Sequence, residues 1–576
     1  MPYGYRAPVE HMRFVMERVL NAPQSWRGCP GFADLDGQTA EAVLDEAARF
    51  AAEVLLPLNT SGDQQGCTRL ADGTVRTPDG FRAAYGAYVE GGWAALPCDP
   101  AWEGQGLPLL LDAAMREMLD ACNHGWNMYP DLLHGAYETL KAHGSEALKQ
   151  RYLADLATGR TLAAMALTEP GAGSDLGVLR SSAQPQPDGT WRVQGDKVFI
   201  SGAEHDLTDQ IVHLVLARTP DAPAGTRGLS LFLVPKHLPQ GARNAWVCTG
   251  LEHKMGIHGS ATCSIRYEGA TGWLIGDLHR GLAAMFLMMN SARLHVGLQG
   301  LGHLEMATQN ARRHAQDRVQ GGGPIAQHPA MRHTLLRLQA RTEALRCMAY
   351  RAALALDEAA HHESPERRAQ QSALAALLTP IVKAYGTQLG FEGAHQALQV
   401  FGGYGYVRET GVEQTLRDAR IALIYEGTNE IQAIDLVQRK LLSDEGRALG
   451  ILMAELETEA AAALAAGLPE AAQALREQIA HARRGLADLQ AAAAQGREAV
   501  LVLCDDALAA YAHLCLAWAW TASSRACMQV LAERPGDDEA AQRLERMRYG
   551  LQWLLPQAQV HWQALGVQRV LPAVCA

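Results

Sequence analysis

Long uninterrupted apolar segments are missing from this chain. Its 576 residues contain no charge-free apolar run of about 18 residues, the length that a membrane-spanning helix requires. The most apolar stretch, Leu501 to Trp520, is interrupted by Asp505 and Asp506. The N-terminus also lacks the basic segment followed by an apolar segment that marks a secretory signal. We therefore expect a cytoplasmic protein with no integral membrane segment.

Paired cysteines and an excess of basic residues are missing as well. The 11 cysteines include no C-x-x-C pair, and a chain of this length does not need disulfides to stabilise its core. The net charge of −11 repels phosphate backbones, so we expect no binding of nucleic acid. A metal site is not expected either, because His253 and His258 have no third ligand at helical spacing.

The residues that are present alternate between helical and strand-like patterns. Residues 1–162 have apolar side chains at three- and four-residue spacing, for example from Thr39 to Leu56. Residues 163–280 contain strand-like runs that begin at Trp191, Ile211, Leu229 and Ser264. Helical spacing returns in residues 281–445, and residues 446–576 are rich in Ala, Leu, Glu and Arg.

This pattern predicts an α+β protein. We expect an N-terminal α-helical domain, a middle domain like a β-barrel or β-sandwich, a second α-helical bundle domain and an additional C-terminal helical domain. Breaks at Gly467-Leu-Pro469 and Arg534-Pro-Gly-Asp537 divide the last of these into several antiparallel helices.

Three short motifs have compositions that suit chemistry. Leu167-Thr-Glu-Pro-Gly-Ala-Gly-Ser-Asp175 predicts a tight exposed loop whose amides and hydroxyls can face a ligand, although it is neither a Walker loop nor G-x-G-x-x-G. Lys197-Val-Phe-Ile-Ser-Gly202 ends a strand with a small hydroxyl residue. The third motif joins Phe401-Gly-Gly-Tyr-Gly-Tyr406 to Leu423-Ile-Tyr-Glu-Gly-Thr-Asn-Glu-Ile-Gln432. It places Glu426 after apolar residues, where burial would raise its pKa toward that of a general base.

Taken singly, each motif is more often a structural loop, a strand end or a salt-bridged glutamate. Together, and in this order, they resemble the acyl-CoA dehydrogenase family over residues 1 to 445. The resemblance implies an FAD cofactor and an acyl-CoA substrate. It makes Glu426 the base that removes the α proton of the thioester while a hydride leaves the β carbon for the flavin. Electrons then pass to an electron-transfer flavoprotein.

The resemblance also implies individual contacts. The cofactor contacts are Met165, Leu167, Thr168, Gly173, Ser174, Phe199, Ile200, Ser201, Arg318, Gln399, Gly402, Gly403, Thr428, Asn429 and Glu430. The substrate contacts are Ser174, Asn290, Arg293 and Gly427. Three positions depart from the family: Phe199-Ile-Ser201 replaces Trp-Ile-Thr, Gln320 stands where Phe is common, and Asn290 where some relatives have Asp. Arg318 should still bind the diphosphate through its planar fork.

Assembly follows from the same resemblance. Gln399, Gly402 and Gly403 match a segment that meets the FAD of a neighbouring subunit, which implies a homodimer. Three-domain relatives commonly form tetramers through their second α domains. Here the apolar stripes of the C-terminal domain, Leu501 to Trp520 and Leu551 to Leu565, are expected to cover that face.

The substrate and the electron acceptor leave alternatives open. The C-terminal domain is similar to that of a subgroup with long-chain, broad-range and 3-methylthiopropanoyl-CoA dehydrogenases, in which Tyr129 to Ala136 falls near the acyl pocket. An unbranched acyl-CoA and the thioether analogue both fit. An acyl-CoA oxidase that uses O₂ would share most of these residues, although the C-terminus carries no S-K-L type address. A DNA-binding flavoprotein of this fold would need a basic C-terminal face. The arginines there are interspersed with acids: Arg483, Arg484, Arg543, Arg546 and Arg548.

Overall fold

The computed structural model of the chain describes residues 4–567 and divides into two compact units. The helical unit comprises Met1–Ala48, Leu109–Ala121 and Val296–Ala576. The barrel unit comprises Arg49–Pro108 and Cys122–His295. The predicted α+β class is confirmed, because helices precede and follow a single large sheet along the chain. Within residues 4–567, no helix has both the length and the apolar character needed to cross a membrane.

Three helices contribute residues to both units. These are α3 (Gly37–Phe50), α6 (Leu109–Asn127) and α9 (Gly281–Asp317). The helix α6 bends at Asn123, where φ is −161° and ψ is 80°. The Asn123 Oδ1 accepts a hydrogen bond from the Trp126 backbone N–H at 3.0 Å, so this side chain caps the turn that follows the bend.

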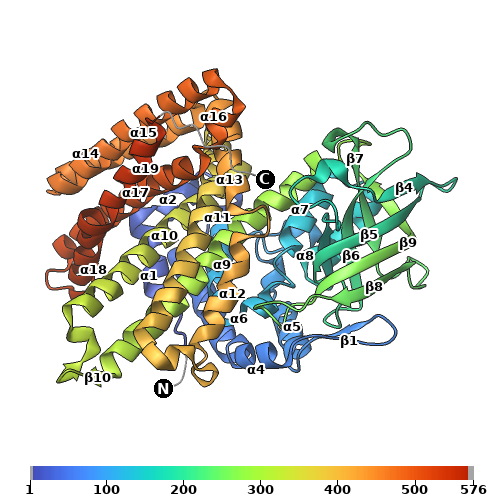
Figure 1. Cartoon of the computed structure of the whole chain (residues 1–576), viewed down its shortest axis with the longest axis horizontal. Coiled ribbons are helices and arrows are strands. Elements are labelled where there is room, and N and C mark those ends of the chain that lie inside the picture. Colours follow the sequence, from blue (N-terminus) through green and yellow to red (C-terminus); the bar gives the residue numbers. More distant parts are fainter. Residues whose placement is uncertain (1–3, 568–576) are drawn as a thin grey trace, which may run out of the picture. The chain divides into compact units, whose positions relative to one another are not determined.

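The sheet of the barrel unit has seven strands and closes on itself (Figure 1). The strands are β3 (Thr161–Ala166), β4 (Ser182–Pro185), β5 (Trp191–Ser201), β6 (Gln210–Arg218), β7 (Leu229–Pro235), β8 (Trp246–Leu251) and β9 (Thr262–Ile275). Their order is β3-β6-β4-β5-β9-β7, with β8 beside β9, and a further β6–β7 pairing completes the closure. All residues of β7 are buried, which explains why this strand is apolar at every position except Ser230.

Helices and short turns complete the barrel unit. They are η3 (Ala51–Leu55), α4 (Pro57–Gln65), α5 (Phe81–Glu90), η4 (Trp93–Ala95), η5 (Pro100–Trp102), α7 (Leu133–His143), α8 (Glu146–Ala157), η6 (Leu176–Val178) and η7 (Thr226–Gly228), with a small ribbon of β1 (Thr68–Arg69) and β2 (Val75–Arg76). Aromatic rings of α5 and of the end of α6 pack together in the core, where the Tyr88 and Trp126 ring centroids are 5.5 Å apart.

The helical unit is built around two long helices, α10 (Pro329–His361) and α11 (Pro365–Phe401). Before them come α1 (Val9–Phe14), η1 (Val15–Val19), α2 (Ala22–Arg27), η2 (Pro30–Phe32), β10 (Val319–Gln320), β11 (Gly323–Pro324) and η8 (Ile325–Gln327). After them come η9 (Gly402–Tyr406), η10 (Arg408–Thr410), α12 (Val412–Arg420), η11 (Ile421–Leu423), α13 (Asn429–Ile434) and η12 (Asp435–Leu442).

The remaining helices of this unit lie in the predicted C-terminal segment. They are α14 (Arg447–Ala465), α15 (Pro469–Gln495), α16 (Arg497–Leu501), α17 (Cys504–Glu533), α18 (Asp538–Tyr549), η13 (Gly550–Leu554), η14 (Leu555–Gln557) and α19 (Ala558–Leu565). Helices end at both predicted breaks, near Gly467 and Gly536. Residues 568–576 of the predicted C-terminal domain lie outside the described residues.

Glycines bring α9 and α11 into direct backbone contact. A Cβ on Gly300 would lie 2.4 Å from the Gly386 carbonyl oxygen, and one on Gly390 would lie 2.4 Å from the Gly300 carbonyl oxygen. A Cβ on Gly297 would likewise meet a side-chain carbon of Val382 at 2.6 Å. No side chain fits between the two helices here, so their spacing is set by the backbones themselves.

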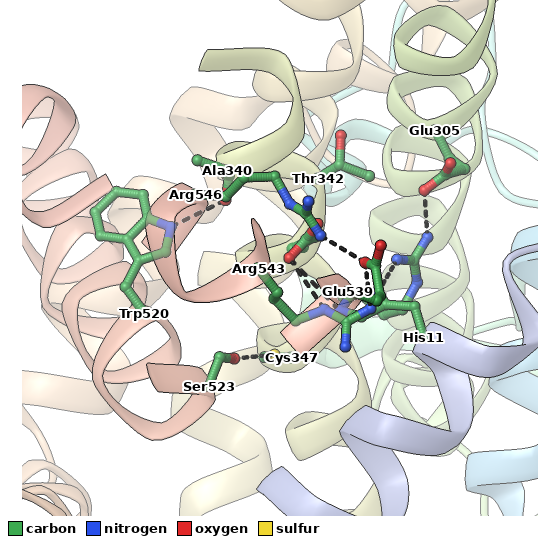
Figure 2. A network of polar contacts seen from close by, with 12 residues as sticks. His11, Glu305, Ala340, Thr342, Cys347, Trp520, Ser523, Glu539, Arg543 and Arg546 are labelled. Carbon is green, nitrogen blue, oxygen red and sulfur yellow. Dashed lines mark hydrogen bonds and ion pairs between the residues drawn. The ribbon is translucent and has the colours of Figure 1, made fainter. Parts of the chain in front are cut away.

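The C-terminal helix α17 packs against α10, α11 and α13, with α18 beside it on α10 (Figure 1). The buried indole of Trp520 donates to the Ala340 carbonyl oxygen at 2.9 Å (Figure 2). From α18, Arg546 forms ion pairs with Glu343 at 2.6 Å and with Glu539 at 2.8 Å. The C-terminal segment therefore covers one face of the α10–α11 pair with both apolar and charged contacts.

A second buried cluster of charges lies next to this contact. Arg346 of α10 donates to Glu117 of α6 at 3.1 Å and to Glu305 of α9 at 2.6 Å. Arg346 also contacts the ring of His11 from α1. Burial, followed by the positive charges of Arg543, Arg346 and Arg546, holds the pKa of His11 well below its usual value. His11 is therefore neutral, and its Nδ1 accepts a hydrogen bond from the Arg346 guanidinium.

The backbone contact between α9 and α11 predicts opposite effects for two glycine-to-alanine substitutions. Gly300→Ala inserts a methyl group where backbone atoms already touch, and we expect it to lower the free energy of unfolding by about 1–3 kcal/mol. Gly450→Ala, on an exposed turn of α14 with nothing within 4 Å of the added carbon, should raise it by about 0.5–1 kcal/mol. Thermal denaturation followed by circular dichroism measures both, and equal shifts of the same sign would refute the contact.

Candidate functional site

The first predicted motif forms a tight turn after β3 in the barrel unit. Glu169 and Ala172 exchange two backbone hydrogen bonds, each of 3.0 Å, and so fold the loop over Pro170. Gly173 and Ser174 are exposed, and a Cβ on Gly173 would meet nothing within 4 Å. The outer side of the turn therefore leaves space for a ligand against its backbone.

A buried ion pair supports this turn from below. The Lys197 ammonium donates to the Leu167 carbonyl at 2.8 Å and to the Glu169 carboxylate at 2.9 Å. The same carboxylate accepts from the backbone N–H groups of Arg180 at 2.7 Å and Ser181 at 2.9 Å. Sequence reasoning missed both partners, although each stands inside a quoted motif, because their pairing links two segments that are distant along the chain.

Burial and pairing act in opposite directions on these two groups. Burial lowers the pKa of Lys197 to about 8, although the nearby Glu169 carboxylate favours the charged form. Burial alone would raise the pKa of Glu169, but Lys197 and the hydrogen-bond donors of residues 180 and 181 together lower it. Glu169 is therefore a carboxylate at neutral pH, and its interactions hold the loop closed.

The second motif lies at a bulge in β5 beside this turn. The Val198 N–H donates to the Thr168 carbonyl at 3.0 Å, and the pairing with β9 shifts register between Lys197 and Ile200. Phe199 adopts a left-handed backbone conformation, with φ of 61°, and its side chain is 62% exposed. Ile200 points into the core, so a contact from this residue would come from its backbone. An exposed aromatic ring on a strained backbone is typical of a binding surface.

Three further predicted residues lie in the barrel unit. Met165 is half-buried on β3, Asn290 is exposed on α9, and Arg293 is buried one turn later on the same helix. Gly135 of α7 packs closely on Met288, since a Cβ there would lie 3.0 Å from the Met288 side chain. The segment Tyr129 to Ala136 is thus largely buried beside the start of α9.

The third motif forms the loop between η11 and α13 in the helical unit. Glu426 and Gly427 both have left-handed backbones, with φ of 54° and 83°. The Gln432 side chain donates to the Glu426 carbonyl at 2.9 Å, and Lys383 donates to the Gly427 carbonyl at 2.7 Å. Glu426 is half-buried and Ile424 is 47% exposed. The apolar sequence around Glu426 thus does not by itself bury the carboxylate.

Residues of α9 and α11 surround this loop. The Tyr425 hydroxyl donates to the buried side chain of Gln299 on α9. From α11, the fully buried Lys383 ammonium reaches the Asn429 side-chain oxygen at 3.0 Å. The Asn429 amide in turn donates to the Ala384 carbonyl at 3.0 Å. Sequence reasoning missed Gln299 and Lys383, which lie in long helices with no motif around them.

The helix α13 begins with a capping residue that the motif supplies. The Thr428 hydroxyl accepts from the Ile431 N–H at 3.4 Å, while Glu430 is exposed in the first turn. A hydrogen bond from Thr428, then the helix terminus, Lys383 and Arg420, hold the pKa of Glu430 below its usual value.

The remaining predicted cofactor residues gather at the other end of α11. Arg318 lies with its guanidinium carbon 5.8 Å from the centre of the Tyr404 ring, in the turn that contains Gly402 and Gly403. Gln399, Gly402 and Gly403 are exposed, and neither glycine has an atom within 4 Å of a Cβ position. Gln320 is also exposed, and its amide donates to the carbonyl of Val319 at 2.8 Å.

These features fit an FAD molecule at each of the predicted places. Phe199 offers an open ring face to a flat heteroaromatic group, and Gly173 leaves backbone amides accessible. Arg318 and the open turn at Gly402 and Gly403 offer a fixed positive charge to a diphosphate.

Three family models match the chain in series. The acyl-CoA dehydrogenase N-terminal domain matches residues 37–160, the middle domain residues 164–270 and the C-terminal domain residues 279–442. The chain is 42% identical over 497 residues to the 3-methylmercaptopropionyl-CoA dehydrogenase of Ruegeria pomeroyi, covering 84% of each chain. It is 34% identical over 482 residues to a broad-specificity linear acyl-CoA dehydrogenase of Mycobacterium tuberculosis, covering 79% of this chain and 78% of that one.

A solved structure agrees with the fold over most of the chain. An acyl-CoA dehydrogenase of Bacillus anthracis complexed with FAD aligns with a TM-score of 0.72 at 21% identity, covering 92% of this chain and 88% of that one. The resemblance that the motifs suggested is confirmed by the family models and the relatives. The chain belongs to the acyl-CoA dehydrogenase family and is an oxidoreductase with FAD as its cofactor.

Proposed function

We propose that this protein converts an acyl-CoA thioester to a trans-2-enoyl-CoA, with Glu426 as the base that removes the α proton. The observation that carries the proposal is the held backbone at Glu426 and Gly427, where Gln432 and Lys383 bind two successive carbonyl groups. A loop fixed in this way presents one carboxylate in one direction, which a general base requires.

Each reacting hydrogen needs its own acceptor. The Glu426 carboxylate takes the α proton, and the electron pair of that C–H bond forms the new α,β double bond. The predicted cofactor contacts, among them Phe199 and Arg318, would hold FAD, and the flavin would supply the acceptor for the β hydrogen and its electron pair. The backbone N–H of Glu426 donates to the thioester oxygen, where negative charge develops as the α proton leaves. Gly427, without a side chain, leaves room for the thioester beside the base.

The substrate contacts follow from the residues of the barrel unit. Arg293 and Asn290 lie on one side of α9 and supply a charge and an amide to the CoA portion, with Ser174 as a further donor. The Ruegeria relative is named for 3-methylmercaptopropionyl-CoA and the Mycobacterium relative for linear acyl-CoA. We propose an unbranched acyl chain, with the thioether analogue as the preferred substrate because the Ruegeria relative is the more similar of the two.

In this proposal the protein itself is located in the cytoplasm. The electrons pass to an electron-transfer flavoprotein. Membership of the acyl-CoA dehydrogenase family supports this choice of acceptor.

The ion pair under the first motif predicts coupled losses of stability and cofactor. Lys197→Met would leave the Glu169 carboxylate buried without its cation, and we expect the free energy of unfolding of the barrel unit to fall by about 3–5 kcal/mol. FAD should then be released at a lower urea concentration, as measured by the rise of flavin fluorescence.

The double variant Lys197→Met with Glu169→Gln removes both charges and should recover part of the loss. Lys149→Met, which breaks the exposed Lys149–Glu146 pair of α8, is the matched control and should change neither property. If Lys197→Met keeps FAD as the unmodified protein does, the pair does not hold the cofactor loop.

The role of Glu426 predicts a specific loss in the Glu426→Gln variant. This variant should fold and retain FAD, and its turnover should fall by about 10²- to 10⁴-fold or more, because the amide cannot accept the α proton. Anaerobic titration with a panel of acyl-CoA thioesters measures this as bleaching of the flavin absorbance. The panel contains butanoyl-CoA, octanoyl-CoA and 3-methylmercaptopropionyl-CoA.

The unmodified protein should bleach with at least one of these thioesters, and Glu426→Gln should not. Turnover of the variant within threefold of the unmodified protein would remove Glu426 from the mechanism. Rapid return of the flavin colour on admission of air, with hydrogen peroxide formed in proportion, would instead assign the protein to the oxidases.

The covered face of the α10–α11 pair predicts the state of assembly. We propose a homodimer, because the resemblance implies that Gln399, Gly402 and Gly403 meet the cofactor of a second subunit. The helix α17 packs on the α10–α11 pair, where we expect three-domain relatives to form tetramers. Light scattering should give about twice the chain mass of 62.2 kDa. Removal of the residues after 445 should cause precipitation or larger assemblies, because it would expose the apolar face under Trp520. A stable tetramer of the intact chain would refute this role of the C-terminal segment.

A further inference from the structure

We infer that Lys383 is a positioning residue for proton abstraction, which fixes the loop of the catalytic base and supplies the positive charge that keeps Glu426 ionised. The inference rests on the proposed role of Glu426. It concerns a side chain of α11 that holds the backbone beyond Glu426 and acts through that backbone.

The loop that carries Glu426 has a backbone conformation that other residues must hold in place. A left-handed backbone at a residue other than glycine is unfavourable, and it persists only where surrounding contacts impose it. Glu426 has φ of 54° and is followed by Gly427 with φ of 83°. Two consecutive left-handed residues turn the chain sharply, so the direction of the Glu426 side chain depends on how firmly this turn is fixed.

Hydrogen bonds from Lys383 and Asn429 fix this turn. Lys383 donates to the Gly427 carbonyl at 2.7 Å and to the Asn429 side chain at 3.0 Å, and it thereby spans the end of the turn and the start of α13. Asn429 is itself held by α11, through the Ala384 carbonyl at 3.0 Å and the Thr387 hydroxyl at 3.1 Å. The Lys383 ammonium thus connects the loop between η11 and α13, which we call the base loop, to α13 and to α11.

A lysine at this buried position has an energetic cost. The Lys383 side chain is fully buried, although its acceptors include a neutral carbonyl and a neutral amide. Burial of an ammonium is unfavourable, and a neutral donor would meet the same two acceptors. The positive charge of Lys383 lowers the pKa of Glu430, so this charge acts on a carboxylate beside the turn. The Glu426 carboxylate belongs to the residue directly before the carbonyl that Lys383 binds.

Other charged groups lie around the same loop and, together with Lys383, influence the ionisation of Glu426. Glu430 of α13, Arg420 of α12 and Asp505 of α17 interact electrostatically around the base loop. Burial and the neighbouring carboxylates of Glu430 and Asp506 raise the pKa of Asp505. The acidic residues outnumber Arg420, so removal of the Lys383 charge leaves Glu426 among groups that oppose its ionisation.

The experiment compares three substitutions that separate geometry from charge. Lys383→Met removes both the donor and the charge, Lys383→Gln keeps a donor without the charge, and Lys383→Arg keeps both in a larger group. Arg525→Met is the matched control, because it removes a cation paired with Glu459 at 2.6 Å in the C-terminal helices of the same unit. Flavin content and thermal denaturation confirm that each variant is folded.

The readouts are kcat, KM, the pH dependence of kcat/KM, and exchange of the α hydrogens of the acyl-CoA with deuterium oxide, followed by mass spectrometry. We expect Lys383→Met to lower kcat and the exchange rate together by about 10- to 100-fold, with KM changed by less than about threefold. Lys383→Gln should recover part of kcat. Both neutral variants should shift the acid limb of kcat/KM to higher pH, because Glu426 loses a charge that favours its ionised form.

Lys383→Arg should restore the position of the acid limb, and Arg525→Met should change none of these quantities. An unchanged acid limb and a kcat within threefold in Lys383→Gln, the variant that keeps a donor without the charge, would overturn the inference. If Glu426→Gln is itself active, the proposed function fails first. If Glu426→Gln is inactive while the Lys383 variants behave as the unmodified protein does, only the role of Lys383 is refuted.

Discussion

The direct backbone contact between α9 and α11 determines the geometry of the helical unit. Because Gly300 and Gly386 leave no side chain between the helices, the position of one helix fixes the other to within the tolerance of van der Waals contact. The base loop is then held from both: Gln299 of α9 binds the Tyr425 hydroxyl, and Lys383 of α11 binds the next turn. A shift of either helix would therefore be transmitted to the loop that carries Glu426.

Buried charges connect the C-terminal helices to this framework. Glu343 of α10 pairs with Arg546 at 2.6 Å and Arg543 at 3.5 Å, while Arg346, one turn along the same helix, is neutralised by Glu117 and Glu305. The two clusters meet at His11 (Figure 2). Loss of a single partner would leave a buried charge uncompensated, which costs more than the pair contributes. These charged pairs thus fix one position of α17 and α18 against α10. Apolar burial alone would permit many registers between the helices.

Much of this architecture could be predicted from the sequence, because periodicity and breaks are local properties. The strand-like runs became β5, β6, β7 and β9, and the breaks at Gly467 and Gly536 separate helices. The supports of the motifs could not be predicted, since Lys197 meets Glu169 and Lys383 meets Gly427 only after folding. The burial expected for Glu426 from its apolar neighbours is only partial. In a sharp turn, consecutive side chains point in different directions, so the exposed Ile424 does not cover the carboxylate.

The left-handed backbone at Glu426 has a consequence for how this position can evolve. Glycine adopts a φ of 54° without strain, whereas glutamate does so only under constraint. The residue that the backbone favours at position 426 is therefore the one with no functional group, and folding and chemistry select for different residues at the same site. A lineage in which another carboxylate took over proton abstraction would gain stability by losing this one. Under the proposed role of Glu426, selection for activity is what retains the carboxylate here.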